Sequence, residues 1–451
     1  MALIVQKYGG TSVGTPEKII EAARQVRAAR ADGHEVVVVV SAMGGVTDKL
    51  LHLASAVSDR PDPGELDALL CTGEAASSAL LSIALNDQGV ASRSFSGAEA
   101  GIRTDHRHGR ATIEQVDPRR LHEDLRKGMV PVVAGFQGEA GAGGPRTTLG
   151  RGGSDTTGVA LAAALGADYC EIVTDVAGVY TADPRKVAGT RRHDALLYEE
   201  MAELAVSGAK VLAADSVDYA RTHGVDLKVR SNQSVTGPET WVVHRRNVPA
   251  PVLGVSWMPT KDTPAIAGVA SHHGLARCVL RRITADRAVR ILRDFVDNGI
   301  EVELRRYGNL GTEDASDVAL TLPVGSVDEA RSLLSGTDRR TRLGEVHWTS
   351  NLARLSVVGL GIGQQSDSPL KLLEALRSIG AARTDVLVTS NKLSVLTGES
   401  SLAEATQSVH DTFVSDVSEA TIDIAGMDTA RPWATDRRHL SVAEPALAAA
   451  D

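Results

Sequence analysis

Four glycine-rich segments in the first half of the chain carry the residue types that bind anions. They span residues 7–12, 41–45, 150–157 and 174–180. Glycines let backbone N–H groups approach an anion closely, and the N-terminus of a following helix adds partial positive charge. One such loop would be an ordinary turn. Four of them, two with an adjacent cation in Lys7 and Arg151, predict a site that handles phosphate.

The order of these residues argues against three common nucleotide-binding patterns. In a P-loop the lysine follows the glycines, whereas Lys7 precedes Gly9 and Gly10 here. The Gly-x-Gly-x-x-Gly fingerprint of dinucleotide-binding folds is missing after the first predicted strand. The protein-kinase catalytic-loop and Asp-Phe-Gly signatures are missing as well.

The elements that must position these loops alternate between strands and helices. β-Branched runs predict strands at 2–8, 35–40, 91–95, 130–134, 169–174 and 226–230. Ala/Leu-rich runs predict helices at 65–85, 118–127, 156–165 and 196–205. This alternation predicts an α/β sandwich around a mainly parallel sheet. In such a sheet, ligands bind where the carboxyl ends of the strands meet the loops.

Composition narrows the possible partners and compartment. The chain has 451 residues, a net charge of −9 and 43% hydrophobic residues, which is typical of a globular protein of roughly three domains. The acidic balance and the 3% aromatic share argue against a nucleic-acid or membrane partner. Three distant cysteines and an N-terminus without a leader pattern predict a cytoplasmic protein. The thirteen histidines, including the pairs 106/108 and 272/273, are interpreted as surface residues, and no metal site is predicted.

The second half divides into smaller segments. Residues 1–246 form the predicted α/β domain, and the proline-containing stretch 247–263 is interpreted as a linker. Residues 264–338 and 345–426 each predict the order strand, helix, strand, strand, helix, strand, which is ferredoxin-like. The remaining 427–451 lack periodicity and predict a disordered tail.

Together, the motifs resemble those of the aspartate kinases, enzymes with the amino-acid kinase fold. Residues 7–13 are similar to the opening signature of that family, 150–155 to its substrate loop, 174–185 to its nucleotide loop and 208–211 to a further nucleotide contact. The resemblance covers nearly all of residues 2–232 in the right order. It implies a three-layer kinase domain followed by two ACT-type regulatory domains, and a homodimer formed through the ACT-like domains. It also implies transfer of the ATP γ-phosphoryl group to the β-carboxylate of L-aspartate, giving 4-phospho-L-aspartate and ADP.

Such a transfer needs little from a general base, because a carboxylate of pKa ~3.9 is already ionised at neutral pH. It needs in-line positioning and neutralisation of the charge on the phosphoryl oxygens. Lys7 is the candidate cation, with backbone N–H groups of Gly9, Gly10 and Gly45 assisting. Asp155 orients Lys7 or a magnesium-bound water, or serves only as an acidic residue at a helix N-terminus. Mg²⁺ is expected to arrive with ATP and to be held mainly by the phosphates.

The two ends of aspartate need opposite charges. A bidentate guanidinium suits the α-carboxylate, which assigns Arg151. By the resemblance, Glu74 binds the α-ammonium, and Lys7, Asp155 and Glu74 are the predicted catalytic residues. The resemblance assigns further substrate contacts to Thr47, Gly152, Gly153 and Ser154.

The resemblance also defines the nucleotide site. Tyr180 is expected to stack on or flank the base, and Lys210 to contact a phosphate or the adenine. The full set implied for ATP is Lys7, Tyr8, Gly9, Gly10, Ser41, Thr174, Asp175, Tyr180, Asp183, Arg185, Lys210 and Val211.

The sequence departs from the family pattern at several positions. Ala75 replaces the usual arginine after the substrate glutamate, and residues 213–215 read Ala-Ala-Asp where the family usually has His-Pro-Arg. The turns at 284–287, 307–310 and 361–368 lack the family's effector-binding residues. Because an effector's charged ends would go unpaired there, we expect weak or absent inhibition by lysine and threonine.

Two other functions compete with this interpretation. A catalytically silent, amino-acid-sensing subunit would have lost its catalytic residues and kept an effector pocket, which is the reverse of what the sequence contains. A kinase of another carboxylate, such as glutamate, acetylglutamate or a nucleoside monophosphate, is the second. Arg151 with Glu74 favours an α-amino acid over the N-acetylated and nucleotide acceptors.

Overall fold

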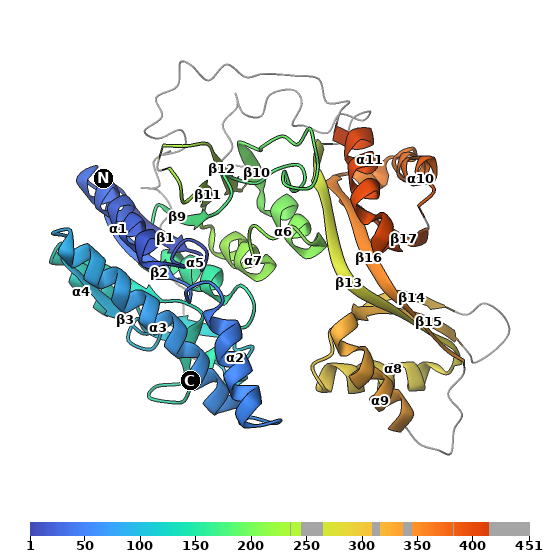
Figure 1. Ribbon diagram of the computed structural model, residues 1–451, viewed down its shortest axis with the longest axis horizontal. Helices are drawn as coiled ribbons and strands as arrows, with labels where there is room; N and C mark the ends of the chain where they lie inside the picture. Colours follow the sequence, from blue (N-terminus) through green and yellow to red (C-terminus); the bar gives the residue numbers. More distant parts are fainter. Residues whose placement is uncertain (235, 245–264, 309–315, 337–344, 382, 415–451) are drawn as a thin grey trace, which may run out of the picture.

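The computed structural model describes residues 1–234, 236–244, 265–308, 316–336, 345–381 and 383–414. The predicted linker 247–263 and tail 427–451 lie outside the described residues. Figure 1 shows an N-terminal α/β part and a C-terminal part built on long antiparallel strands.

The N-terminal part contains the predicted, mainly parallel sheet. Only the β11–β12 pair is antiparallel among the paired strands of this sheet. Its order is β10 (Ala195–Leu197), β12 (Glu239–Val243), β11 (Leu227–Ser231), β9 (Tyr169–Thr174), β1 (Leu3–Tyr8), β2 (Glu35–Val40), β6 (Val130–Ala134) and β3 (Ser92–Phe95). The six strands predicted from β-branched runs agree with this sheet to within one residue at each end.

Helices cover both faces of the sheet, because the central strands are apolar on both sides. In β2, Val36, Val38 and Val40 pack into one core and Val37 and Val39 into the other. The first core lies under α1 (Pro16–Ala31) and α3 (Pro63–Asp87). The helices that pack on the other face are α4 (Arg119–Arg126), α5 (Gly153–Leu165), α6 (Tyr198–Ser207) and α7 (Ala214–His223).

A small second sheet flanks the site end of this domain. Its order is β5 (Ile113–Val116), β4 (Ile102–Thr104), β7 (Gln137–Ala140) and β8 (Arg146–Thr148). Strands β7 and β8 form an antiparallel hairpin, and β8 leads directly into the 150–157 loop. This sheet therefore sets the direction from which that loop enters α5.

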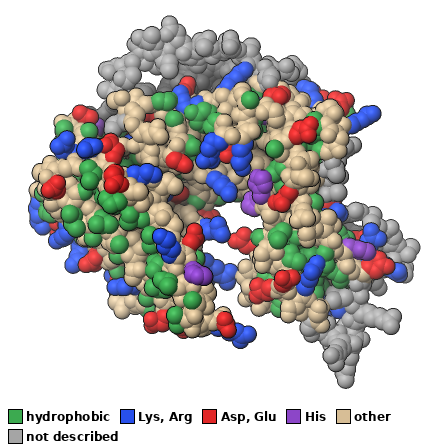
Figure 2. Space-filling model, viewed as in Figure 1, with side chains coloured by type: hydrophobic (Ala, Val, Ile, Leu, Met, Phe, Trp, Pro, Cys, Tyr) green, Lys and Arg blue, Asp and Glu red, His purple; other side chains and the backbone are tan. Residues whose placement is uncertain are grey.

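Helix α3 is the most apolar long helix among the described residues. By length and composition it could cross a membrane, but half of its most apolar window is buried inside the protein. Leu80 and Ile83 of α3 and Ile20 of α1 are exposed, and these two helices pack against each other. Figure 2 shows hydrophobic side chains gathering on the side of the molecule where the two helices lie in Figure 1. Packing on the sheet accounts for the apolar composition of the buried half.

The C-terminal part forms one six-stranded antiparallel sheet. Its order is β14 (Glu303–Gly308), β15 (Ser316–Pro323), β13 (Ala265–Ile283), β16 (Val346–Leu360), β18 (Lys392–Gly398) and β17 (Arg383–Thr389). Two separate cores lie along it, one under each pair of helices. The helices are α8 (Ala285–Asp297) with α9 (Val327–Gly336), and α10 (Ser368–Ser378) with α11 (Leu402–Val414).

The boundaries 264–338 and 345–426 imply two ferredoxin-like units that are separate in sequence. In the structure the two units are not separate in this way. β13 has 19 residues, about 60 Å of strand, and therefore spans both units. Residues 275–283 pair with β15 as the first strand of the first unit, whereas residues 265–272 pair with the end of β16. The second unit thus takes its fourth strand from residues that precede the first unit. The strand predicted after the last helix of the second unit falls at 415–426, outside the described residues.

The C-terminal sheet docks on the N-terminal part through α6. This helix packs across β13 and β16. Arg354 of β16 donates a hydrogen bond to the carbonyl oxygen of Val206 near the C-terminus of α6, at 2.9 Å, and Lys392 of β18 forms an ion pair with Glu203. Cations near a helix C-terminus are stabilised by its partial negative charge. The sheet and α6 are therefore joined by charged contacts as well as by apolar packing.

Candidate active site

The glycine-rich loops meet at the carboxyl edge of the parallel sheet because they follow adjacent strands. Gly9 N–H donates to the Val173 carbonyl at 3.2 Å, and Ser41 N–H to the Tyr8 carbonyl at 3.1 Å. Gly135 N–H, after β6, donates to the Val40 carbonyl at 2.9 Å. These bonds hold the ends of four neighbouring strands together, as the sequence predicts.

A buried ion pair joins β1 to α5 at this edge. The ammonium of Lys7 contacts the carboxylate of Asp155, and their side chains are only 9% and 12% exposed. Asp155 lies in the first turn of α5. A Cβ on Gly158, one turn further along α5, would lie 3.2 Å from the Cβ of Lys7. The absence of a side chain at Gly158 thus makes room for Lys7 between β1 and α5.

Two loops approach this pair from β2 and from the start of α5. The hydroxyl groups of Ser41 and Ser154 lie 2.7 Å apart. Gly10 packs directly on the backbone after β2, where a Cβ would lie 2.7 Å from the Ala42 carbonyl oxygen. A side chain at position 10 would push the two loops apart. The predicted phosphate contacts Gly9, Gly10 and Ser41 are therefore brought together around Lys7 and Asp155.

Glu74 is a buried carboxylate with only one oxygen satisfied. It lies on α3, and its Oε1 accepts the Ala42 N–H at 3.0 Å. Its Oε2 is buried and has no hydrogen-bond partner in the part of the chain that the structure describes. Burial raises the pKa of Glu74 to about 7. A half-satisfied buried carboxylate of this kind suits a cationic group of a ligand.

The start of α5 shapes the predicted substrate loop. Gly152 adopts a left-handed conformation at φ 73° before the helix begins at Gly153. A side chain at Gly152 would clash with the Cβ of Ala213, so the departure from the family pattern at 213–215 lies beside this loop. Arg151 is exposed, and Thr47 lies half-buried in the first turn of α2 (Val46–Val57), directly after Gly44 and Gly45.

The predicted nucleotide loop is held by its own charges. Asp183 accepts a hydrogen bond from the Arg185 guanidinium at 3.0 Å, and this bond lowers the pKa of Asp183. Arg185 also lies 3.9 Å from Asp175, whose Oδ1 accepts the Thr174 hydroxyl at 3.2 Å. Tyr180 is half-buried and forms a β-bridge further along the loop.

The same loop is also anchored to the C-terminal part. Val269 N–H of β13 donates to the Thr181 carbonyl at 2.7 Å, and His410 of α11 lies 2.9 Å from the Thr181 hydroxyl. Burial lowers the pKa of His193 to about 4, so its neutral ring donates to the Ala267 carbonyl at 2.7 Å. Lys210 is exposed and Val211 half-buried, in the segment after Gly208 that backs onto β13. One strand of the C-terminal sheet thus supports both predicted nucleotide segments.

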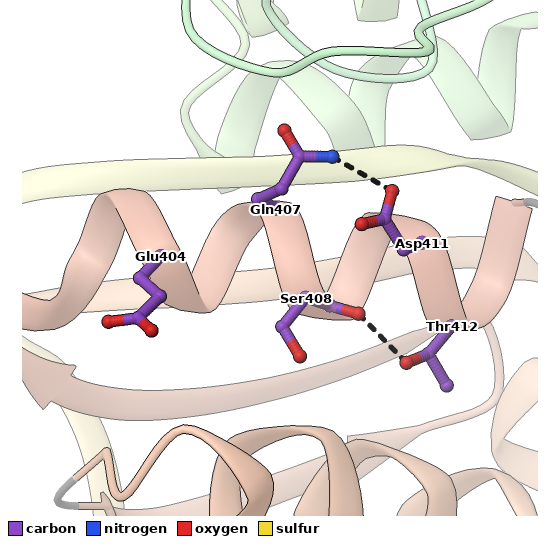
Figure 3. A pocket seen from close by; sticks show the side chains of 5 residues that line it. All are labelled: Glu404, Gln407, Ser408, Asp411 and Thr412. Carbon is purple, nitrogen blue, oxygen red and sulfur yellow. Dashed lines mark hydrogen bonds between the residues drawn. The ribbon is translucent and has the colours of Figure 1, made fainter.

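A cavity of about 480 Å³ lies along α11 (Figure 3). It is lined by Glu404, Gln407, Ser408, Asp411 and Thr412. Gln407 donates to Asp411 at 2.8 Å and accepts the Ala188 N–H at 2.8 Å. None of the predicted site residues lines it. We interpret it as the polar outer face of the helix that braces the nucleotide loop.

Not every predicted residue reaches the site. The ring of Tyr8 is fully buried in the core beneath α1, because alternate residues of a strand point to opposite faces and Lys7 takes the face toward α5. The prediction that Tyr8 contacts ATP is therefore wrong for its side chain. Phe136 is a further residue beside the site that the sequence did not predict. It has φ 68°, and its N–H donates to the Thr157 hydroxyl at 3.0 Å, which braces α5. The preceding Gly135, directly after a predicted strand, was the available signal.

Comparisons with known proteins identify the family of the chain. A model of the amino acid kinase family matches residues 2–231. The aspartate kinase of Pseudomonas putida is 39% identical over 415 residues, which cover 92% of this chain and 98% of that protein. The aspartokinase of Corynebacterium efficiens is 38% identical over 418 residues, covering 92% of this chain and 96% of that protein. A crystal structure of E. coli aspartokinase III in complex with aspartate and ADP has a TM-score of 0.73 at 24% identity, covering 91% of this chain and 99% of that one.

The raised pKa of the buried Glu74 predicts how the stability of the protein depends on pH. In the unfolded chain this group ionises near its ordinary pKa of 4.5, but in the folded protein only near 7. The native state therefore loses stability as pH rises through this range, by about 3 kcal/mol in all. We expect Glu74→Gln to gain unfolding free energy relative to wild type between pH 5 and pH 8, measured by denaturant titration. Exposed Glu123→Gln is the control, and an equal effect of both variants at the two pH values would contradict the assignment.

Proposed function

Because the chain belongs to the aspartate kinases of the amino acid kinase family, we propose that it transfers the γ-phosphoryl group of ATP to the β-carboxylate of L-aspartate. The products are 4-phospho-L-aspartate and ADP. The observation that carries this proposal is the buried Lys7–Asp155 pair at the meeting point of the glycine-rich loops, close to a half-satisfied Glu74. A cation for phosphate and a carboxylate for an ammonium are the two charges that these substrates require.

In the proposed reaction, a carboxylate oxygen of aspartate forms a bond to the γ-phosphorus while the bond from that phosphorus to the bridging oxygen breaks. The electron pair leaves with ADP. Lys7 neutralises charge on the phosphoryl oxygens, and Asp155 holds the Lys7 ammonium in place. The N–H group of Gly10 and the N-terminus of α5 add partial positive charge on the same side, whereas the Gly9 N–H is already engaged by the Val173 carbonyl. No side chain has to remove a proton.

Aspartate is proposed to lie between α3 and the substrate loop. The unpartnered oxygen of Glu74 accepts its α-ammonium, and Arg151, exposed at the start of the loop, pairs with its α-carboxylate. ATP lies along 174–185, with Tyr180 beside the base. Mg²⁺ would supply further charge neutralisation on the phosphates, and Asp155, the carboxylate paired with Lys7, would be the side chain of this chain to hold it.

Removing the Lys7 ammonium tests the proposal. We expect Lys7→Ala to lower kcat on the order of 10²–10³-fold, because a group that stabilises developing charge is lost. The assay traps the acyl phosphate with hydroxylamine and identifies aspartate hydroxamate by its mass. Lys371→Ala, on the exposed face of α10, is the matched control. Undiminished turnover by Lys7→Ala would refute the role of Lys7.

The same assay separates the alternative functions. With aspartate and glutamate offered together, only the aspartate hydroxamate should form at a substantial rate. A glutamate product would indicate a kinase of another amino-acid carboxylate. Absence of any product, together with binding of lysine but not ATP in calorimetry, would indicate a sensing subunit.

We also propose that lysine and threonine inhibit this enzyme weakly or not at all. At the turn before α10, Gly361 N–H already donates to the Asn391 side chain at 3.2 Å and Gly363 N–H to the Ser390 carbonyl at 3.1 Å. These amides are engaged within the protein, so they are less available to an effector. Residues 309–310 of the other predicted effector segment lie outside the described residues.

Inhibition assays check this proposal. Purified enzyme is assayed with lysine, with threonine, with both, and with leucine as an unrelated amino acid. We expect all four conditions to retain most of the activity at sub-millimolar effector. Strong inhibition by lysine plus threonine, but not by leucine, would show that an effector pocket persists.

A homodimer through the C-terminal sheet is a further part of the proposal. Its edge strand β17 exposes Val386 and Val388, and an exposed apolar edge favours pairing with another chain. We expect light scattering to give about twice the chain mass of 47.3 kDa. Val388→Lys should shift the protein toward monomer, whereas Ile83→Lys on α3 should not. A monomeric wild type would contradict the proposal.

A further inference from the structure

A second buried carboxylate of α3 lies behind the predicted substrate loop. The side chain of Asp67 is 2% exposed, and it lies seven residues before Glu74. Seven residues are two helical turns, about 10 Å, so both carboxylates project from the same face of α3. Nothing in the proposed chemistry uses Asp67 directly. Its burial therefore has to be explained by the groups that it holds.

Asp67 is fully engaged by two segments that are far from it in sequence. Its Oδ1 accepts the hydroxyl of Thr148 at 2.6 Å, and its two oxygens lie 3.1 and 3.2 Å from the N–H of Gly109. Its Oδ2 lies 2.7 Å from Nδ1 of His108. Among the described residues, His108 is the ionisable side chain that hydrogen-bonds to Asp67. The His108 ring also packs on Gly64, where a Cβ would lie 3.4 Å from its Cε1.

These contacts correct the prediction that His108 is a surface histidine. Its side chain is only 25% exposed, whereas His106, two residues earlier in the same loop, is exposed. The sequence does not distinguish the two histidines. In the structure, His108 is the one that lies beside the buried carboxylate of Asp67. The 105–112 loop is thereby tied to the N-terminal half of α3.

The same contacts reach the substrate loop. Thr148 ends β8, and Arg151 follows three residues later. The Ala111 N–H donates to the Thr148 carbonyl at 2.8 Å, and a Cβ on Gly150 would lie 3.3 Å from the Gly109 carbonyl oxygen. The 108–111 segment therefore lines the entry of the substrate loop, and Asp67 fixes both.

We propose that Asp67 and His108 are positioning residues for the aspartate-binding loop, which they hold through Thr148 and Gly109 so that Arg151 faces the α-carboxylate. This inference rests on the proposed function. The catalytic pair has its own anchors, because Ser154 contacts Ser41, Asp155 contacts Lys7, and Thr157 contacts Phe136. Loosening Thr148 and Gly109 should therefore weaken aspartate binding more than it slows phosphoryl transfer.

The test compares steady-state kinetics of variants in the full-length enzyme. We expect His108→Ala to raise KM for aspartate about tenfold, because a hydrogen bond to a charged group is lost. KM for ATP and kcat should stay within about twofold. His108→Gln, which can still donate to Asp67, should recover most of the affinity. His106→Ala is the matched control and should behave as wild type.

Thr148→Val removes the other donor without changing the shape of the side chain, and it should reproduce the rise in KM for aspartate if His108→Ala fails to fold. The proposal is overturned if KM for aspartate is unchanged in both variants. It is also overturned if kcat and both KM values change together and His108→Gln gives no recovery, as a purely structural role would require. Failure of the wild type to phosphorylate aspartate would instead refute the proposed function itself.

Discussion

The ion pair between Lys7 and Asp155 is the constraint on which the site depends. Both side chains are almost completely buried, one at the end of β1 and the other in the first turn of α5. Removing either partner would leave an uncompensated buried charge, at a cost of about 3–5 kcal/mol. The pair therefore fixes α5 against the sheet. Because α5 begins directly after the substrate loop, it also fixes the distance between the phosphate-binding and aspartate-binding groups.

A second buried charge network supports the phosphate-binding loop from the opposite side of the sheet. Arg230 of β11 is bidentate to Glu171 of β9, and it also donates to Gln25 of α1 at 2.9 Å. Burial alone would raise the pKa of Glu171, but Arg230 holds it below its ordinary value. This network reaches the loop after β1 through Asn232, whose side-chain amide donates to the Ser12 hydroxyl at 3.0 Å. Three elements that meet at the edge of the sheet are thus tied to the loop after β1.

Local sequence patterns predicted the parts of the fold that depend on local physics. Continuous β-branched runs mark strands buried on both faces, and glycines at their ends mark the loops that share one edge. Patterns of this kind carry little information on partners far away in sequence. The sequence therefore could not show that Tyr8 faces the core, that His108 rather than His106 meets Asp67, or that β13 serves two units. Each of these follows from long-range packing.

The most direct test of the account is a crystal structure with a non-hydrolysable ATP analogue and L-aspartate bound together. We expect the Lys7 ammonium to lie about 2.7–2.9 Å from an oxygen of the γ-phosphate, and Glu74 to lie at the same distance from the aspartate ammonium. A nucleotide whose phosphates bind away from Lys7, with Asp155 still covering the ammonium, would contradict the central claim.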